Sequence, residues 1–306
     1  MVQHIGVEVN LPRWYTHRKA GHERRMNLDY FGYYNGVFAP LETLMVPACD
    51  RGLYFGDGVY EALRVENHRP FALEEHLERF YASLQALRID FSMPEAELRD
   101  VLSELSDRVD SNSQLLYFQV TRGTAIRTHA FPENAKPNLM AYAKHAPLAD
   151  VSERWKAILL PDIRWANCNI KTLNLIPNVM AAQQAKERGC KEAVFHRDGV
   201  VTECSSSNLL MLRDGVLYTA PADHRILAGV TRARFLLLAK EFGIPVVEEA
   251  FTVDEAFEAD ELIITSTSVH GPGVCELEGR PVGGKDPDRL KKLQSAFRTF
   301  FWDSLQ

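Results

Sequence analysis

The sequence predicts an α+β fold in two domains, and three observations lead to it. Asn35-Gly36, Asp198-Gly199 and Asp214-Gly215 each lie between apolar runs, which is typical of β-hairpins because these residues tolerate a positive φ. Apolar residues that recur every three or four positions between the hairpins predict amphipathic helices. The regular strand–helix alternation of a doubly wound parallel sheet is missing, so the pattern favours hairpins interleaved with helices.

The N-terminal half predicts one sheet with two helices. YFGYYNGVFAP begins at Tyr30 and predicts a hairpin, and residues 58–66 alternate as a strand. Leu73, Leu77, Phe80, Leu84 and Leu87 form the stripe of a first helix, and Leu98, Val101, Leu102, Leu105 and Val109 form the stripe of a second. Residues 114–122 and 137–143 have the apolar composition of buried strands.

The C-terminal half follows a short non-periodic stretch that contains Pro147. It predicts a strand at 156–161, a helix at about 174–188 closed by Gly189, strands around Val194 and Val201, and helices at about 231–242 and 287–304. We therefore expect an N-terminal arm at 1–28, a smaller α+β domain at 29–144, a linker at 145–154 and a larger domain at 155–306.

Composition and charge narrow the class of function. The 306 residues carry a formal charge of −6, which favours a small-molecule partner over nucleic acid or an anionic membrane. The five cysteines are scattered and form no CxxC pair, so neither a disulfide framework nor a metal site is expected. The sequence has neither an apolar run near the ~18 residues of a membrane span nor an apolar signal core, and we expect a cytoplasmic protein.

Lys171 is the first residue that invites a chemical interpretation. It lies in CNIKTLNLIPN, between a predicted strand and a predicted helix. A desolvated lysine there loses part of its preference for the charged form and becomes a nucleophilic amine suited to Schiff-base chemistry. The alternative is an ordinary surface lysine on a loop.

Three further segments are rich in polar groups. TECSSSN (202–208) places Glu203 beside three hydroxyls at the end of a strand, where a carboxylate can pair with a protonated ring nitrogen. GVTRARF (229–235) and TSTS (265–268) combine a helix N-terminus with hydroxyls, which favours an anion. Each also has a plainer interpretation: a polar turn for the first, and an N-cap at Thr231 and a turn for the other two.

The segment RGTAIRTH (122–129) holds Arg127 and His129 two residues apart. If this segment is extended, the two side chains share a face and can hold a carboxylate, with Arg127 using its planar guanidinium. The alternative is a solvated loop.

Taken together, these segments resemble the fold-type IV pyridoxal-phosphate enzymes. DRGLYFGDGVYEALRV, RTHAFPEN, IKTLNL, TECSSSN, GVTR and ELIITSTS occur in order, and the resemblance runs from about Tyr30 to the C-terminus. The RxH pair within RGTAIRTHAFPEN points to the D-amino-acid aminotransferase branch of this class IV family. The resemblance implies a transaminase that uses pyridoxal 5′-phosphate as its cofactor.

The resemblance also implies roles for individual residues. Lys171 corresponds to the residue that forms the Schiff base with the cofactor and moves the proton at the substrate Cα, and Glu203 to the carboxylate that faces the pyridine nitrogen. The residues that correspond to further cofactor contacts are Arg79, Ser206, Leu227, Val230, Thr231, Ser266 and Thr267. Tyr60, Arg127 and His129 correspond to the site for the substrate α-carboxylate, the latter two reaching in from the second subunit of a homodimer.

The implied reaction exchanges amino and keto groups between a D-amino acid, such as D-alanine or D-glutamate, and a 2-oxo acid, such as 2-oxoglutarate or pyruvate. Alternatives within the fold are an aminodeoxychorismate lyase and a transaminase for L-branched amino acids or (R)-amines, which the pair Arg127 and His129 disfavours. A cofactor-binding protein without activity is the alternative from another class. Cys204 departs from the family pattern, where glycine usually follows the glutamate.

Overall fold

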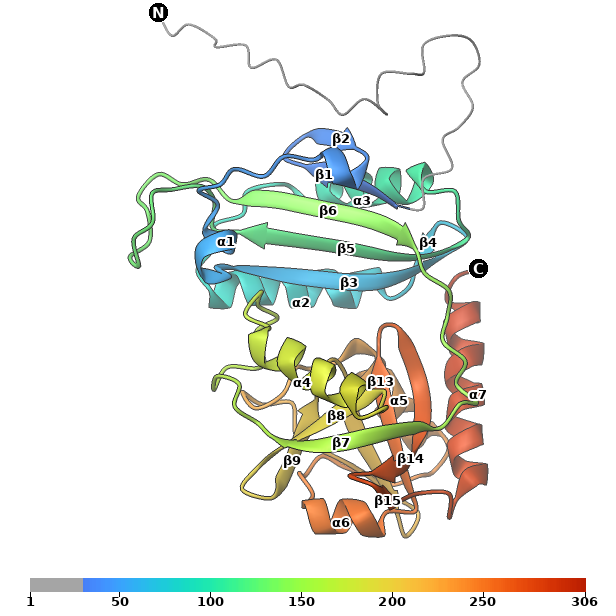
Figure 1. The fold of residues 1–306 in the computed structure, drawn as a ribbon. Helices are drawn as coiled ribbons and strands as arrows, with labels where there is room; N and C mark the ends of the chain where they lie inside the picture. Colours follow the sequence, from blue (N-terminus) through green and yellow to red (C-terminus); the bar gives the residue numbers. More distant parts are fainter. Residues whose placement is uncertain (1–29) are drawn as a thin grey trace, which may run out of the picture.

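The computed structural model describes residues 30–306, which form two sheets with their helices (Figure 1). The arm predicted at 1–28 lies outside the described residues. No helix within 30–306 is both long enough and apolar enough to cross a membrane.

The N-terminal sheet has six antiparallel strands in the order β2-β1-β6-β5-β3-β4. The strands are β1 (Tyr30–Tyr34), β2 (Val37–Ala39), β3 (Gly58–Glu66), β4 (Arg69–Pro70), β5 (Ser113–Thr121) and β6 (Asn138–His145). Helices α2 (Leu73–Ala86) and α3 (Glu95–Arg108) pack on one face of the sheet. Their apolar stripes form a core with the inward side chains of the strands, which leaves the other face of β3 free to line a site.

The C-terminal sheet has nine strands, and its main path runs β12-β11-β10-β13-β14-β7-β8-β9, with β15 paired to β14. The strands are β7 (Trp155–Pro161), β8 (Glu192–Arg197), β9 (Val200–Cys204), β10 (Asn208–Arg213), β11 (Val216–Thr219), β12 (Val246–Val247), β13 (Glu261–Ser266), β14 (Val269–Leu277) and β15 (Arg280–Pro281). The helices are α4 (Ile176–Glu187), α5 (Val230–Glu241), α6 (Val253–Glu258) and α7 (Pro287–Asp303). Parallel and antiparallel pairs are mixed, as an α+β fold allows.

Most predicted elements are confirmed within two or three residues. Asn35-Gly36 turns the β1–β2 hairpin with φ of 43° and 93°. Two short helices were not predicted, namely α1 (Arg51–Phe55) and α6. The second has a readable signal, because Thr252 and Glu255 form a reciprocal capping box at its start.

Two of the alternatives left open by the sequence are resolved by the structure. Thr231 is not the N-cap of α5, because the helix begins one residue before it and Gly229 occupies the cap position. The segment 122–129 is not an extended strand, because β5 ends at Thr121 and Gly123, with φ 111°, turns the chain away from the sheet. The connection from β5 to β6 therefore projects from one end of the sheet (Figure 1).

The two halves of the described chain meet through backbone and aromatic contacts. The amide of Tyr60 on β3 donates to the carbonyl of Lys171 at 3.0 Å, and Phe71 packs on Phe301 of α7 with ring centroids 4.7 Å apart. β6 ends at His145 and β7 begins at Trp155, so the connection between the sheets is short. The domain boundaries at 144 and 155 stay a prediction.

Candidate active site

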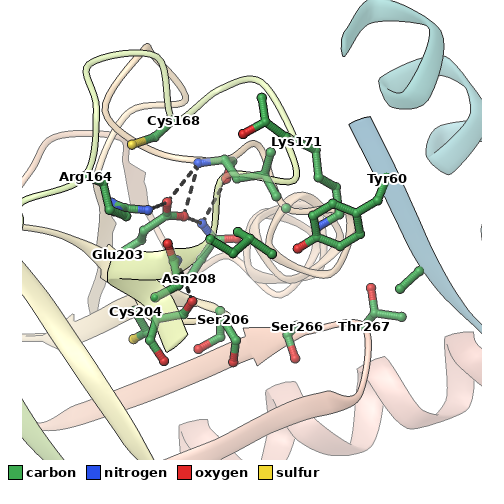
Figure 2. A pocket seen from close by; sticks show the side chains of 18 of the residues that line it. Tyr60, Arg164, Cys168, Lys171, Glu203, Cys204, Ser206, Asn208, Ser266 and Thr267 are labelled. Atoms are coloured by element: carbon green, nitrogen blue, oxygen red, sulfur yellow. Dashed lines mark hydrogen bonds and ion pairs between the residues drawn. The ribbon is translucent and has the colours of Figure 1, made fainter. Parts of the chain in front are cut away.

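A cavity of about 570 Å³ opens between the two sheets, a size typical of small-molecule sites. Its lining comes from β3, α2, the segment before α4, the β9–β10 turn, the start of α5 and the β13–β14 turn. Figure 2 shows side chains that line it, among them Tyr60, Lys171 and Glu203. The predicted site residues among its lining are Tyr60, Arg79, Lys171, Glu203, Ser206, Leu227, Val230, Thr231, Ser266 and Thr267. Arg127 and His129 do not line the cavity of this chain.

The backbone at Lys171 is held against β3. Thr172 pairs with Val59 as an isolated bridge, and the Leu173 amide donates to the Gly58 carbonyl at 3.0 Å. A side chain at Gly58 would meet the Leu173 side chain at 2.9 Å and the Val120 carbonyl at 2.6 Å, so the close approach needs a glycine. The loop that bears Lys171 is thereby fixed to the neighbouring sheet.

The Lys171 amine points into the cavity beside an aromatic ring. Its Nζ lies 4.3 Å from the centroid of the Tyr60 ring, within cation–π range (Figure 2). Tyr60 itself stacks on Tyr117, and Tyr117 on Tyr142, with centroids 5.5 and 5.0 Å apart. This row of rings fixes the position of Tyr60 and so defines one wall for the lysine.

Glu203 lies at the opposite end of the cavity and is almost fully buried. Asn208 Nδ2 donates to Oε2 at 2.9 Å, the Leu227 amide donates at 3.1 Å, and Arg164 forms an ion pair with Oε1 (Figure 2). Burial raises the pKa of Glu203 to about 7, while Arg164 opposes that rise. A further positive charge in the cavity would therefore lower the pKa of Glu203.

Sequence reasoning missed Arg164 and its partner Asp162. Two nitrogens of Arg164 donate to Asp162 at 2.9 Å, and Asp162 also accepts from Thr202 at 3.0 Å. Asp162 therefore orients the Arg164 guanidinium toward Glu203. No spacing in DIRWANCN signals this, because the ion pair joins a loop to a strand 39 residues further along the chain.

Arg79 is anchored by a second buried carboxylate. Glu61 is fully buried and accepts from Arg79 Nε at 2.7 Å, from Arg79 Nη2 at 2.8 Å and from His76 Nδ1 at 2.8 Å. Arg79 Nη1 donates to the Ala228 carbonyl at 2.8 Å, just before α5. A sequence signal existed here, since Glu61 occupies the inward-facing series Val59, Glu61, Leu63 and Val65 of β3.

The start of α5 and the β13–β14 turn offer donors for an anion. The N-cap of α5 is Gly229, which supplies no side-chain cap, and Val230 and Thr231 at the start of the helix line the cavity. Thr265 Oγ1 is buried without a hydrogen-bond partner among the described residues, and it belongs to the cavity lining with Ser266 and Thr267. These groups suit a phosphate, which accepts several hydrogen bonds.

The serines of TECSSSN are arranged by a carboxylate that sequence reasoning also missed. Glu192 on β8 is buried and accepts from Ser206 at 3.0 Å, from Ser207 at 2.8 Å and from Ser205. Ser206 therefore donates its hydroxyl away from the cavity that it lines. This hydrogen bond helps to fix the conformation of the β9–β10 turn that follows Glu203.

Cys204 follows Glu203 at the end of β9 and is buried. Burial raises the pKa of the Cys204 thiol well above its usual value, with the nearby Glu192 carboxylate acting in the same direction. The thiol stays protonated at neutral pH and is a poor nucleophile. All five cysteines, which lie within the described residues, are free.

Arg127 and His129 are brought together outside the cavity. Both are exposed, and both lie against Phe55: the Arg127 guanidinium carbon is 4.9 Å from the ring centroid, and the His129 ring centroid is 5.4 Å away. The two side chains therefore share a contact with Phe55, although the segment is not a strand. On this chain alone they reach no residue of the cavity.

Comparison with known families gives one model that matches more than half of the chain. The model describes class IV amino-transferases and matches residues 58–276. The matched region includes every predicted site residue from Tyr60 to Thr267.

Curated relatives and solved structures agree with this match. The chain is 39% identical to D-alanine aminotransferase of Staphylococcus aureus (strain MSSA476) over 88% of this chain and 96% of the relative. It is 40% identical to D-alanine aminotransferase of Bacillus licheniformis over 87% and 95%. Its fold is similar to that of a T.th. branched-chain amino acid aminotransferase with pyridoxamine 5′-phosphate, with a TM-score of 0.80 and 25% identity over 88% of this chain and 92% of that chain.

Proposed function

The chain belongs to the class IV aminotransferases, and we propose that it exchanges amino and keto groups between D-amino acids and 2-oxo acids. The proposed amino donors are small D-amino acids such as D-alanine or D-glutamate, and the proposed acceptors are 2-oxoglutarate and pyruvate. The observation that carries the proposal is the placement of Lys171 and Glu203 in one cavity of a chain 39% identical to a D-alanine aminotransferase.

Pyridoxal 5′-phosphate is the proposed cofactor, and the cavity fits it at three points. Lys171 supplies an amine for the covalent bond, and the buried Glu203 supplies a counter-charge for a protonated ring nitrogen. The uncapped start of α5, with Val230 and Thr231, and the unpartnered Thr265 hydroxyl suit the phosphate. Arg79, Ser266 and Thr267 would complete the phosphate site, and Leu227 would pack on the ring.

When bound, the cofactor withdraws electrons from the Cα of the substrate. Lys171 Nζ would take the proton from the substrate Cα as a general base and later donate it on the same face as an acid. Glu203, held by Arg164 and Asn208, keeps a proton on the ring nitrogen when its own carboxyl is ionised. The row of tyrosines that begins at Tyr60 excludes water from one side of the lysine.

Substrate handedness follows from where the α-carboxylate is held. We propose that Tyr60 of one subunit with Arg127 and His129 of the other bind this group, which fixes the face of Cα that meets Lys171. The exposure of Arg127 and His129, and their proximity over Phe55, support a homodimer in which each chain completes the site of its partner. The five free thiols favour a reducing compartment, so we place the enzyme in the cytoplasm.

The decisive experiment incubates the purified protein and cofactor with D-alanine and 2-oxoglutarate and follows the formation of pyruvate. The proposal requires turnover with D-alanine and none with L-alanine under the same conditions. A parallel arm with L-leucine and 2-oxoglutarate tests a branched-chain transaminase, and an arm with aminodeoxychorismate tests a lyase. Turnover in either of these arms without turnover of D-alanine would show that the substrate class is wrong.

A further inference from the structure

Arg51 is a buried cation whose partners belong to the loop that carries Arg127 and His129. Only 2% of Arg51 is exposed. Its Nη1 donates to the Thr128 carbonyl at 2.7 Å and to the Ala130 carbonyl at 3.4 Å, and its Nη2 donates to the His129 carbonyl at 3.4 Å. One guanidinium thus binds three successive carbonyls, which fixes the backbone on both sides of His129.

The positive charge of Arg51 is balanced by Asp57, at the start of the strand that carries Tyr60. Arg51 Nε donates to Asp57 Oδ2 at 2.7 Å, and Asp57 directly precedes β3. Asp57 also accepts from Arg122 Nε and Nη2 at 2.9 Å, at the point where β5 runs into the loop. The loop and the Tyr60 strand are consequently tied to the same carboxylate.

The helix of Arg51 also supplies the surface on which the two side chains rest. Phe55 is the last residue of α1, and its ring contacts both Arg127 and His129 at the distances given above. The Arg51 guanidinium carbon lies 4.9 Å from the same ring. A single five-residue helix therefore holds the loop by its backbone and by its side chains.

The loop has few other anchors near its tip. Its base is closed by backbone bonds, from Arg51 N to Gly123 O at 3.0 Å and from Ala125 N to Cys49 O at 3.1 Å. Beyond this base, Ile126 is 85% exposed, and residues 127–131 are all exposed. The Phe131 ring, further along the loop, lies 3.6 Å from the Arg122 guanidinium carbon and 4.8 Å from that of Arg88. Arg51 and Phe55 contact the segment from Arg127 to Ala130 itself.

We propose that Arg51 is a positioning residue for binding of the substrate α-carboxylate. It holds the carbonyls of Thr128, His129 and Ala130, so that Arg127 and His129 both stay in contact with Phe55 in the arrangement that binds a carboxylate. The inference rests on the proposed function, because it needs Arg127 and His129 to bind that group. Arg51 touches neither substrate nor cofactor in this role.

The test measures D-alanine transamination by the dimeric holoenzyme with Arg51→Gln, Arg51→Lys and Phe55→Leu. A displaced pair should raise the apparent KM for D-alanine by about 10- to 100-fold in Arg51→Gln, since small misplacements of binding groups have effects of this size. Arg51→Lys keeps the charge but cannot serve three carbonyls, so its KM should fall between those of wild type and Arg51→Gln. The kcat and the cofactor dissociation constant should change little. All three quantities should stay close to wild type in the control Arg213→Lys, because Arg213 pairs with Glu258 and does not line the cavity.

A combined variant separates positioning from general damage. Because Arg51 acts through Arg127 and His129, the Arg51→Gln substitution should add little to the KM of an enzyme that carries both Arg127→Ala and His129→Ala. A full additive increase in that background, or an unchanged KM in Arg51→Gln, overturns the inference. If Arg127→Ala alone leaves the KM unchanged, the proposed carboxylate site fails instead. Should Arg51→Gln not fold, Arg51→Lys and Phe55→Leu in the same two backgrounds decide between these outcomes.

Discussion

The Arg79 guanidinium binds both oxygens of the Glu61 carboxylate, with Nε 2.7 Å from Oε1 and Nη2 2.8 Å from Oε2. His76 Nδ1 lies 2.8 Å from the same carboxylate, and Glu61 and His76 are buried. The arginine that we propose for the cofactor phosphate site is therefore already paired. Its orientation toward the cavity depends on a carboxylate in the core of the smaller sheet.

Replacing Glu61 with Gln should destabilise the fold by about 3 kcal/mol, because removal of one partner leaves a buried positive charge without its counter-charge. Urea unfolding at pH 7 measures this difference. Glu74→Gln is the matched control, since Glu74 also pairs with an arginine, Arg99, but on the exposed surface. Equal losses in the two variants would contradict the buried role of Glu61.

The pH dependence of the same pair has a definite sign. Burial raises the pKa of Glu61, but Arg79 and His76 outweigh it and lower the pKa from 4.5 to about 2. A carboxyl whose pKa is lower in the folded state stabilises the protein above pH 4.5, and this contribution is lost as the pH falls toward 2. Wild type should lose about 2 kcal/mol of this contribution between pH 7 and pH 3, and about 3 kcal/mol on full protonation, which Glu61→Gln does not lose. Urea midpoints of both proteins at about pH 7, 4.5 and 3 measure it.

Some of the site was predictable from sequence because its groups sit at the ends of regular elements. Glu203 and the serines follow a strand whose alternation is plain, and Val230 and Thr231 open a helix with a clear end at Gly243. Lys171 was predicted by its motif rather than by its surroundings. These residues are close in sequence to the elements that place them.

The rest depends on contacts between distant segments, which local patterns do not encode. Arg164 reaches Glu203 from a loop without periodicity, and Arg51 reaches a carbonyl 77 positions away. The segment of Arg127 and His129 was predicted to share a face if extended, whereas a common contact with Phe55 brings the two side chains together. Glu61 was seen as part of a strand, yet its charge on an apolar face was not recognised as a signal.

Arg164 should set the pH range in which the cofactor binds. Burial raises the pKa of Glu203 to about 7 even with Arg164 beside it. Loss of that positive charge removes the influence that lowers the pKa, so Arg164→Gln should move the titration upward by about 1 to 3 pH units. Cofactor affinity of the apoenzyme, followed by absorbance, should weaken as the pH falls through about 7 in wild type, and at higher pH in the variant.

Arg197→Gln is the control for that shift, because Arg197 contacts Asp162 at 3.2 Å but makes no bond to Glu203 among the described residues. Its binding curve should stay close to that of wild type. A binding curve that does not move in Arg164→Gln would show that the ion pair does not govern the charge of Glu203.

Reduction with borohydride should attach the cofactor to Lys171 and to no other lysine. The physical reason is that Lys171 lines the cavity, whereas lysines such as Lys186 on α4 are exposed. Peptide mapping of the reduced protein locates the modified residue. Lys171→Ala should abolish transamination and Lys186→Ala should retain it; normal turnover by Lys171→Ala would contradict the assigned role.

Mixing an inactive variant, Lys171→Ala, with an impaired one, Arg127→Ala, tests whether Arg127 acts across a dimer. Lys171→Ala keeps Arg127, and Arg127→Ala keeps Lys171, so a mixed dimer contains one site with both groups if Arg127 comes from the partner. After unfolding and refolding together, the mixture should regain about a quarter of wild-type activity, since about half the dimers are mixed and each has one complete site. Each variant refolded alone gives the baseline, and a mixture that stays at this baseline would place Arg127 on its own chain's site.

Gly229→Ala should weaken cofactor binding through steric displacement rather than backbone strain. Its φ of −72° suits any residue, but a Cβ there would lie 2.0 Å from Asn208 Oδ1. Asn208 donates to Glu203 at 2.9 Å and to the Leu227 carbonyl at 2.9 Å. A shift of Asn208 that relieves the clash therefore disturbs both the position of Glu203 and the segment that leads into α5.

The contrasting substitution is Gly189→Ala, where the Cβ meets no atom within 4 Å but φ is 68°. This variant should lose about 1 kcal/mol of stability from its left-handed backbone while it keeps its cofactor affinity. Gly229→Ala should instead lose mainly cofactor affinity. Its cofactor dissociation constant should rise by about tenfold or more, equivalent to at least about 1.4 kcal/mol of lost binding free energy. Fluorescence titration of both apoenzymes and thermal unfolding of both holoenzymes distinguish the two. If the dissociation constants change equally, the contact between Gly229 and Asn208 has no special part in holding the cofactor.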